Sequence, residues 1–142
     1  MIYKKQKIIN HNIDKLFDMV MDIEKYPQFL PWCSSAKIIS QKSPANLTAS
    51  LQISFKLIKL TYQSDVKYSK QDYIIAANAI SGPFKALKNK WNFTKIDNSK
   101  TKVDFFIDFQ FNSKILEKTI GSLFEIAAKK MIDAFEKRAN SL

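Results

Sequence analysis

The chain has 142 residues and a mass of 16.4 kDa, which suits one domain spanning residues 1–142 and leaves no room for a second. Its 46% hydrophobic and 13% aromatic residues argue against disorder, and the single cysteine excludes an intrachain disulfide and a multi-cysteine metal site. A net charge of +10 is compatible with a nucleic-acid, ribosome or anionic-membrane partner. However, 22 Lys and 18 Ile against one Arg also indicate general compositional bias, and the scarcity of Arg argues against specific nucleic-acid recognition, DNA included.

The N-terminal residues contain one strand signal and two short helix signals. Residues 2–9 alternate loosely between apolar and polar side chains, which predicts an opening strand. Asn12 can cap a helix that ends near Asp22. Pro27 and Pro31 forbid a long helix after it, so we expect only a short helical turn there. The apolar positions of the first helix recur at helical spacing: Ile13, Leu16, Phe17 and Val20.

The middle of the chain has the period-two alternation of antiparallel strands. Strands are expected over residues 46–57, 60–68 and 73–80, after an alternating segment that begins near Ser35. One face of the first of these carries only apolar side chains: Leu47, Ala49, Leu51, Ile53, Phe55 and Leu57. These segments therefore predict a meander.

The second half of the sheet is predicted from a break and a hairpin. Gly82-Pro83 interrupts the sheet, residues 88–90 form an unusually basic loop, and Trp91 and Phe93 begin the next strand. Residues 97–100 read as a hairpin turn. The strand that follows has the clearest apolar face of the chain: Val103, Phe105, Ile107, Phe109 and Phe111.

The C-terminal residues predict one long amphipathic helix over residues 114–139, with Ser113 as its N-cap. Such a helix is about 40 Å long and needs an apolar partner, which only the sheet can provide. We therefore predict an α+β fold, in which a curved antiparallel sheet of six to seven strands and two short N-terminal helices are followed by a long helix across the concave face. The helical stripe consists of Leu116, Ile120, Leu123, Phe124, Ala127, Met131, Ala134 and Phe135.

A twisted sheet diverges from a straight helix at the helix ends, so this geometry favours an apolar cavity, although the same side chains would also serve a solid core.

The sequence contains only weak signals for catalytic residues. Asp104 and Asp108 lie about 13 Å apart along one strand, on the face opposite the apolar one. His11 is the only histidine in the chain, and Cys33 has no histidine in the same stretch of sequence. We expect no catalytic residues, no metal site and no enzymatic activity.

Two blocks of sequence resemble the coenzyme Q-binding START-domain family, within the larger polyketide cyclase/dehydrase and START-like group. The first block is Tyr26-Pro27-Gln28-Phe29-Leu30-Pro31-Trp32-Cys33. The second is Gly82-Pro83-Phe84-Lys85-Ala86-Leu87, followed by Trp91-Asn92-Phe93. The resemblance spans nearly the whole chain and departs from the family mainly in the basic residues 88–90. It implies the helix-grip (START-like) fold.

The resemblance also implies two functions of different classes. Mitochondrial members bind ubiquinone and support respiration, whereas some bacterial members are ribosome-association toxins that bind the large subunit and block subunit joining. A polyketide cyclase-like activity is a third alternative.

Our first prediction is that the protein binds ubiquinone or a similar isoprenoid lipid without catalysing a reaction and without a catalytic cofactor. We expect it to be cytoplasmic and to contact an anionic inner membrane peripherally when it exchanges its ligand. The expected ligand contacts are Phe29, Trp32, Leu51, Ile53, Phe55, Phe84, Trp91, Phe93, Phe105, Ile107, Phe109, Leu123, Phe124, Ala127 and Met131.

Overall fold

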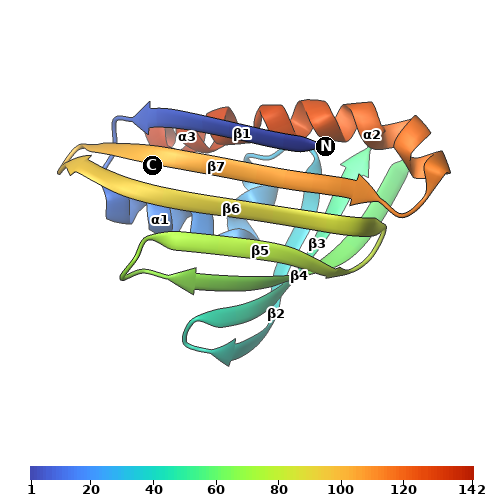
Figure 1. Ribbon diagram of the computed structural model, residues 1–142, viewed down its shortest axis with the longest axis horizontal. Helices are drawn as coiled ribbons and strands as arrows, with labels where there is room; N and C mark the ends of the chain where they lie inside the picture. Colours follow the sequence, from blue (N-terminus) through green and yellow to red (C-terminus); the bar gives the residue numbers. More distant parts are fainter.

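The computed structural model describes residues 1–142 as one seven-stranded antiparallel sheet with helices behind it (Figure 1). The strand order across the sheet is β1-β7-β6-β5-β4-β3-β2, so the first and last strands of the chain are neighbours. This confirms the predicted α+β architecture and the upper limit of the predicted strand number. The strands are β1 (Ile2–Ile9), β2 (Cys33–Ser43), β3 (Asn46–Phe55), β4 (Ile58–Ser69), β5 (Ile74–Ser81), β6 (Phe84–Asp97) and β7 (Lys100–Phe111).

The core lies on the concave face of the sheet, and β7 shows how the sequence pattern produces it. All its odd-numbered residues from Thr101 to Phe111 are buried, while the residues between them point to the outer face. The pairing of β7 with β1 and β6 holds this alternation in register, with Phe105 opposite Lys5 on one side and Trp91 on the other. A slip of one residue would expose the whole apolar row to water, so the pattern itself specifies the register.

Strand β3 ends two residues before its predicted end. The expected apolar row included Leu57, but that residue is 98% exposed at the tip of the β3–β4 hairpin. The preceding residue, Lys56, has a φ of 55°, and this left-handed conformation reverses the chain before Leu57 can join the row. The end of this strand was predicted wrongly because the sequence contains neither Gly nor Asn at the turn. These residues favour such two-residue turns, but the turn forms here without them.

Strand β6 runs without interruption through the residues that were predicted to form a basic loop. Lys88 pairs with Asp108 of β7 and Asn78 of β5, and Lys90 pairs with Phe106 and Ala76. The polar sequence hid the strand because Lys88 and Lys90 point to solvent, while Asn89 between them points inward. Pairing with neighbours on both sides outweighs the low strand propensity of Lys and Asn.

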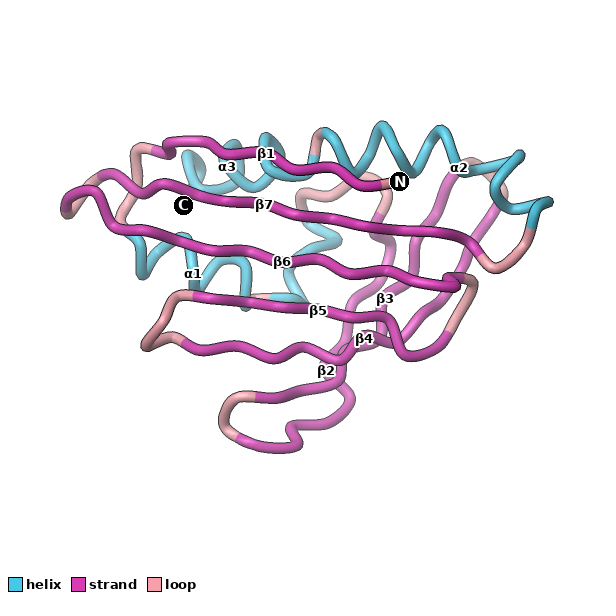
Figure 2. Tube along the Cα trace, viewed as in Figure 1, coloured by secondary structure: helices cyan, strands magenta, loops and turns pink.

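The two N-terminal helices form as predicted. Helix α1 (Ile13–Met21) is capped by the Asn12 side chain, which accepts a hydrogen bond from the Asp14 backbone N–H at 2.9 Å. It is followed by the 3-10 helix η1 (Ile23–Gln28), which contains Pro27. Both helices lie behind the sheet in Figure 2.

The C-terminal segment is two helices rather than the single helix predicted. Helix α2 (Lys114–Lys129) is capped by Ser113, as expected, and α3 (Met131–Ser141) follows after Lys130 (Figure 2). No Pro or Gly marks this kink in the sequence. The physical reason for it is tertiary, because α2 packs on β7 whereas α3 packs on α1, and one straight helix cannot reach both.

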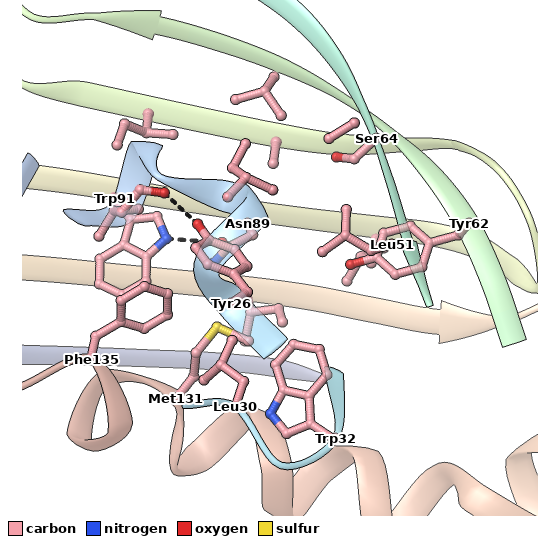
Figure 3. Close-up of a pocket in the computed structure, with 18 of the residues that line it drawn as sticks. Tyr26, Leu30, Trp32, Leu51, Tyr62, Ser64, Asn89, Trp91, Met131 and Phe135 are labelled. Atoms are coloured by element: carbon pink, nitrogen blue, oxygen red, sulfur yellow. Dashed lines mark hydrogen bonds between the residues drawn. The ribbon is translucent and has the colours of Figure 1, made fainter. Parts of the chain in front are cut away.

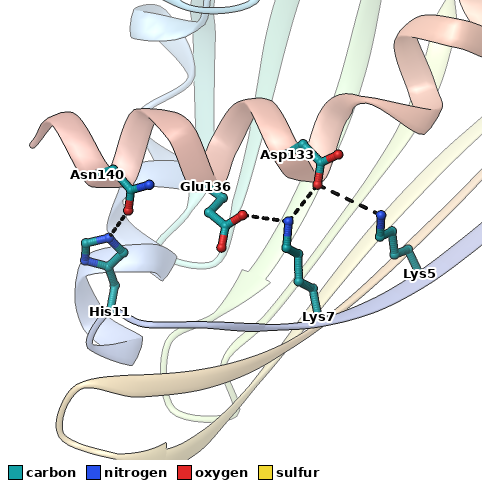
Figure 4. A network of polar contacts seen from close by, with 6 residues as sticks. All are labelled: Lys5, Lys7, His11, Asp133, Glu136 and Asn140. Carbon is teal, nitrogen blue, oxygen red and sulfur yellow. Dashed lines mark hydrogen bonds and ion pairs between the residues drawn. The ribbon is translucent and has the colours of Figure 1, made fainter.

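Polar contacts fasten edge strand β1 to α3 (Figure 4). Lys7 Nζ lies 2.8 Å from Asp133 Oδ1 and 2.6 Å from Glu136 Oε1, and His11 Nε2 lies 2.7 Å from Asn140 Oδ1. Hydrogen bonding to Asp133 raises the pKa of Lys7, and the same bond lowers the pKa of Asp133. These half-exposed pairs hold the helix in position but contribute little energy each.

Candidate functional site

A small cavity lies between the concave face of the sheet and the helices (Figure 3). Every strand from β3 to β7, both N-terminal helices and both C-terminal helices contribute to its wall. Of its 19 lining residues, 17 are hydrophobic. They are Val20, Ile23, Tyr26, Leu30, Trp32, Ala49, Leu51, Tyr62, Ser64, Val66, Ile75, Ala77, Leu87, Asn89, Trp91, Ile107, Phe124, Met131 and Phe135.

The cavity volume is about 70 Å³. A cavity of about 10–15 Å³ on this measure already admits one water molecule, so this space would hold only a few. Pockets that bury drug-sized ligands have volumes of about 300–1,000 Å³. A quinone ring therefore enters only if the walls move apart, and the helical wall is made of two segments joined at the Lys130 kink.

Most polar groups in the wall are already paired within the protein. The Trp91 indole N–H donates to Asn89 Oδ1 at 3.0 Å (Figure 3), and Asn89 Nδ2 donates to the Phe106 carbonyl at 2.9 Å. The Tyr26 hydroxyl donates to the carbonyl of Val20, and the Ser64 hydroxyl donates weakly to that of Asn78 at 3.4 Å. These bonds satisfy the buried donors that the apolar surroundings would otherwise penalise.

Tyr62 is the exception among the polar side chains of the wall. Its side chain is only 8% exposed, its hydroxyl points into the cavity in Figure 3, and no protein group accepts its proton. Burial raises the pKa of both Tyr62 and Tyr26, so both hydroxyls stay protonated at neutral pH. The cavity therefore offers an apolar ligand one free hydrogen-bond donor.

The wall contains no group suited to acid–base or nucleophilic chemistry at neutral pH. None of its residues is Asp, Glu, His, Lys or Arg. Cys33 lies outside the wall and is buried, and this burial raises the pKa of its thiol to about 11. Its thiol donates to the Ser35 carbonyl at 3.6 Å, which is a packing arrangement rather than that of an activated nucleophile.

The structure brings six of the fifteen predicted contact residues to the cavity wall. These are Trp32, Leu51, Trp91, Ile107, Phe124 and Met131. The other nine lie outside the wall. Ile53, Phe84, Phe93, Phe105 and Phe109 are buried elsewhere in the core, Phe29, Phe55 and Ala127 are partly buried against it, and Leu123 is half-buried outside the packed cluster.

Sequence reasoning missed the polar residues of the wall, although the alternation contained a signal for some of them. Ser64 lies two residues from both Tyr62 and Val66, which point inward from β4, so it must point inward as well. Asn89 shares the parity of Leu87 and Trp91 on β6. A strand prediction through residues 84–97 would therefore have placed Asn89 in the cavity.

A curved antiparallel sheet that is closed over an apolar cavity by C-terminal helices defines the helix-grip class of proteins. The model of the family described as "Polyketide cyclase / dehydrase and lipid transport" matches residues 9–136, and the chain belongs to this family. This agrees with the resemblance seen in the sequence. None of its helices combines the length and the apolar character that crossing a bilayer requires.

The chain is similar to two known proteins in sequence and to a third in fold. The ribosome association toxin RatA of Rickettsia prowazekii is 45% identical over 99% of this chain and 97% of its own length. The mitochondrial coenzyme Q-binding protein COQ10 homolog B of Xenopus laevis is 26% identical over 99% of this chain and 58% of its own length. The Zhui aromatase/cyclase from Streptomyces sp. R1128 superposes with a TM-score of 0.85 over 99% of this chain and 93% of its own, at 12% identity, so this likeness shows the fold alone.

Proposed function

We propose that this protein binds the large ribosomal subunit and blocks its joining to the small subunit. The observation that carries the proposal is the 45% identity to a ribosome association toxin over nearly the full length of both chains. The small cavity supports it, since about 70 Å³ does not accommodate an isoprenoid quinone without rearrangement. The net charge of +10 also supports it, because ribosomal RNA presents a dense array of phosphates.

Sedimentation tests the proposal directly. Purified protein is mixed with bacterial ribosomal subunits at low salt and separated on a sucrose gradient. We expect co-sedimentation with the large subunit and fewer complete ribosomes when the small subunit is then added. The homologue from Rickettsia prowazekii serves as a positive control. Free protein at the top of the gradient, with subunit joining unchanged, would rule the proposal out.

The cavity favours a second candidate function, non-enzymatic binding of ubiquinone or a similar apolar lipid. The wall is almost wholly hydrophobic, and the unpaired hydroxyl of Tyr62 matches a carbonyl oxygen on an otherwise apolar ligand. Opening of the helical wall at Lys130 would supply the missing volume. A cyclase activity has less support, because the cavity holds no group that exchanges a proton near neutral pH.

Fluorescence and extraction test this second function. Trp32 and Trp91 both line the cavity, so added ubiquinone is expected to quench their emission. Leu51→Trp would fill the cavity and abolish quenching, whereas Ile38→Trp, on the exposed part of β2, is the matched control. Organic extracts of freshly purified protein should contain quinone or another lipid. Extracts without lipid, together with unquenched emission, would exclude this function.

A further inference from the structure

The outer face of the sheet, which carries no helix, presents a row of lysines around an aromatic ring. In the registers of the ladders, Lys4 of β1 lies opposite Phe106 of β7, and Phe106 lies opposite Lys90 of β6. The row continues through Ala76 of β5 to Lys67 of β4. Neighbouring strands are about 4.8 Å apart, so this row is about 19 Å long. This face is turned toward the viewer in Figure 1.

Phe106 is the centre of this arrangement. Its ring is only partly buried on the outer face, and Lys4 Nζ lies 5.8 Å from the ring centroid. Its neighbours on β7 at the same face are Asp104 and Asp108, and the residues directly opposite it on β1 and β6 are lysines. A partly exposed aromatic ring on a sheet, with a lysine opposite it on each neighbouring strand, is the kind of surface on which nucleic-acid bases stack.

The lysines of this face are free to bind anions. Lys4, Lys67, Lys88 and Lys90 are all exposed, and none of them takes part in an ion pair, whereas Lys5 and Lys7 of β1 point to the other side and bind Asp133. Lys88 and Lys90 are two residues apart on β6, which separates them by about 7 Å along the strand. These four residues are called the outer-face lysines below.

The same face also carries three carboxylates, which limit its positive potential. Asp104 accepts a hydrogen bond from Gln6 Nε2 at 2.8 Å, and Asp65 lies 4.0 Å from Lys42 Nζ. Asp108 lies opposite Lys88 without forming an ion pair. The carboxylates lie in the rows on either side of the lysine row, so that row itself carries only positive charge.

We propose that the outer face of the sheet binds single-stranded RNA, with Phe106 stacking on a base and the outer-face lysines contacting the phosphates. The proposal rests on the ribosomal function proposed above and deepens it, because it names RNA as the component recognised and this face as the surface. With a single Arg in the chain, recognition uses lysine point charges and stacking, which tolerate any base sequence.

An RNA titration tests the stacking part of the proposal. The probe is a fluorescein-labelled dodecauridylate, and binding is followed by fluorescence anisotropy. Phe106→Leu keeps an apolar side chain but removes the ring, and it should weaken binding at least about fivefold, the lower end of the effect of losing one stacked base. Phe106→Tyr keeps the ring and should retain the affinity. Equal melting temperatures of the variants show that the fold is unchanged.

The salt dependence tests the lysines. Four contacts to a single strand give a slope of log Kd against log salt of about 2.8, and loss of two contacts lowers it by about 1.4. Lys4→Gln/Lys90→Gln should show this decrease. Lys118→Gln/Lys137→Gln removes the same charge from exposed positions of α2 and α3 that form no ion pair, and it should leave the slope unchanged.

The outcomes separate this proposal from the ribosomal one. Suppose that the wild-type protein co-sediments with the large subunit, and that the lysine and Phe106 variants bind both the subunit and the dodecauridylate as tightly as the wild type does. The RNA-binding face is then refuted, and the ribosomal function stands. If the wild-type protein binds dodecauridylate through this face but no ribosomal subunit, the ribosomal function fails and the face stands. If the wild-type protein does not bind RNA, the proposed RNA-binding face is refuted. It is also refuted if the lysine variant loses binding to phosphatidylglycerol vesicles but keeps its binding to RNA.

Discussion

Phe124 is the side chain through which α2 is anchored to the sheet, and replacing it tests how the cavity is closed. The ring is 2% exposed and contacts five other aromatic rings. The centroid distances are 4.6 Å to Phe109, 5.4 Å to Phe84, 5.8 Å to Phe111, and 6.4 Å to both Trp32 and Phe55. Because these partners lie on three strands (β3, β6 and β7) and on the segment before β2, Phe124 joins the helix to both halves of the concave face.

Phe124→Ala should lower the free energy of unfolding by about 3–5 kcal/mol, the usual cost of truncating a buried Phe. The upper end is expected here, because edge-to-face pairs contribute about 0.5–1.5 kcal/mol beyond burial and because the cavity beside the ring would grow rather than collapse. Domains of this size have total stabilities of about 5–15 kcal/mol, so the variant loses a large share of its stability.

Urea unfolding followed by Trp fluorescence measures this change. The matched control is Leu123→Ala, which removes a side chain at the adjacent helix position that is half-buried and outside the packed core. Leu123→Ala should cost less than about 1 kcal/mol, since sites away from the core tolerate truncation. Equal losses in the two variants would refute the placement of α2, because they would mean that Leu123 faces the sheet as closely as Phe124 does.

Three further predictions concern groups away from that contact. Asp133→Asn should lower the free energy of unfolding by less than about 1 kcal/mol at pH 7. The difference should begin to shrink as the pH falls below about 4, the pKa of Asp in the unfolded chain, and should vanish once the pH is below the lowered pKa of Asp133 in the folded protein. Cys33 should react with iodoacetamide at pH 8 roughly a hundredfold more slowly than a free thiol, since burial raises its pKa to about 11, and urea should restore the rate. Asn89→Leu should cost about 1–3 kcal/mol in urea unfolding by leaving the Trp91 N–H unpaired.

Each of these has an outcome that contradicts it. A difference for Asp133→Asn that persists at pH 2 would mean that the ion pair with Lys7 is not its source. Rapid labelling of Cys33 in the folded protein would show that the start of β2 opens readily. For Asn89, the control is Asn92→Leu on the outer face of the same strand, and an equal cost at both sites would exclude a special role for the buried amide.

The sequence by itself determined the elements whose signals are local. Period-two alternation is sufficient to find β7, because one side of that strand is buried and the other is partly exposed. Asn12 and Ser113 marked the starts of α1 and α2, since a side-chain cap depends only on the next few residues. The two blocks that resemble the coenzyme Q-binding START-domain family identified the family correctly.

Only the tertiary structure decided features that depend on distant partners. The kink at Lys130 exists because α2 and α3 pack on different elements, and the sequence near it contains no helix-breaking residue from which the kink could be predicted. Asn89 became part of the cavity because β5 and β7 pair with β6 on both sides, which local propensity opposes. The cavity wall also required tertiary information, since burial places a side chain in the core but does not say whether a neighbour or a void lies against it. For that reason Phe124 lines the cavity while the equally apolar Phe109 packs beside it.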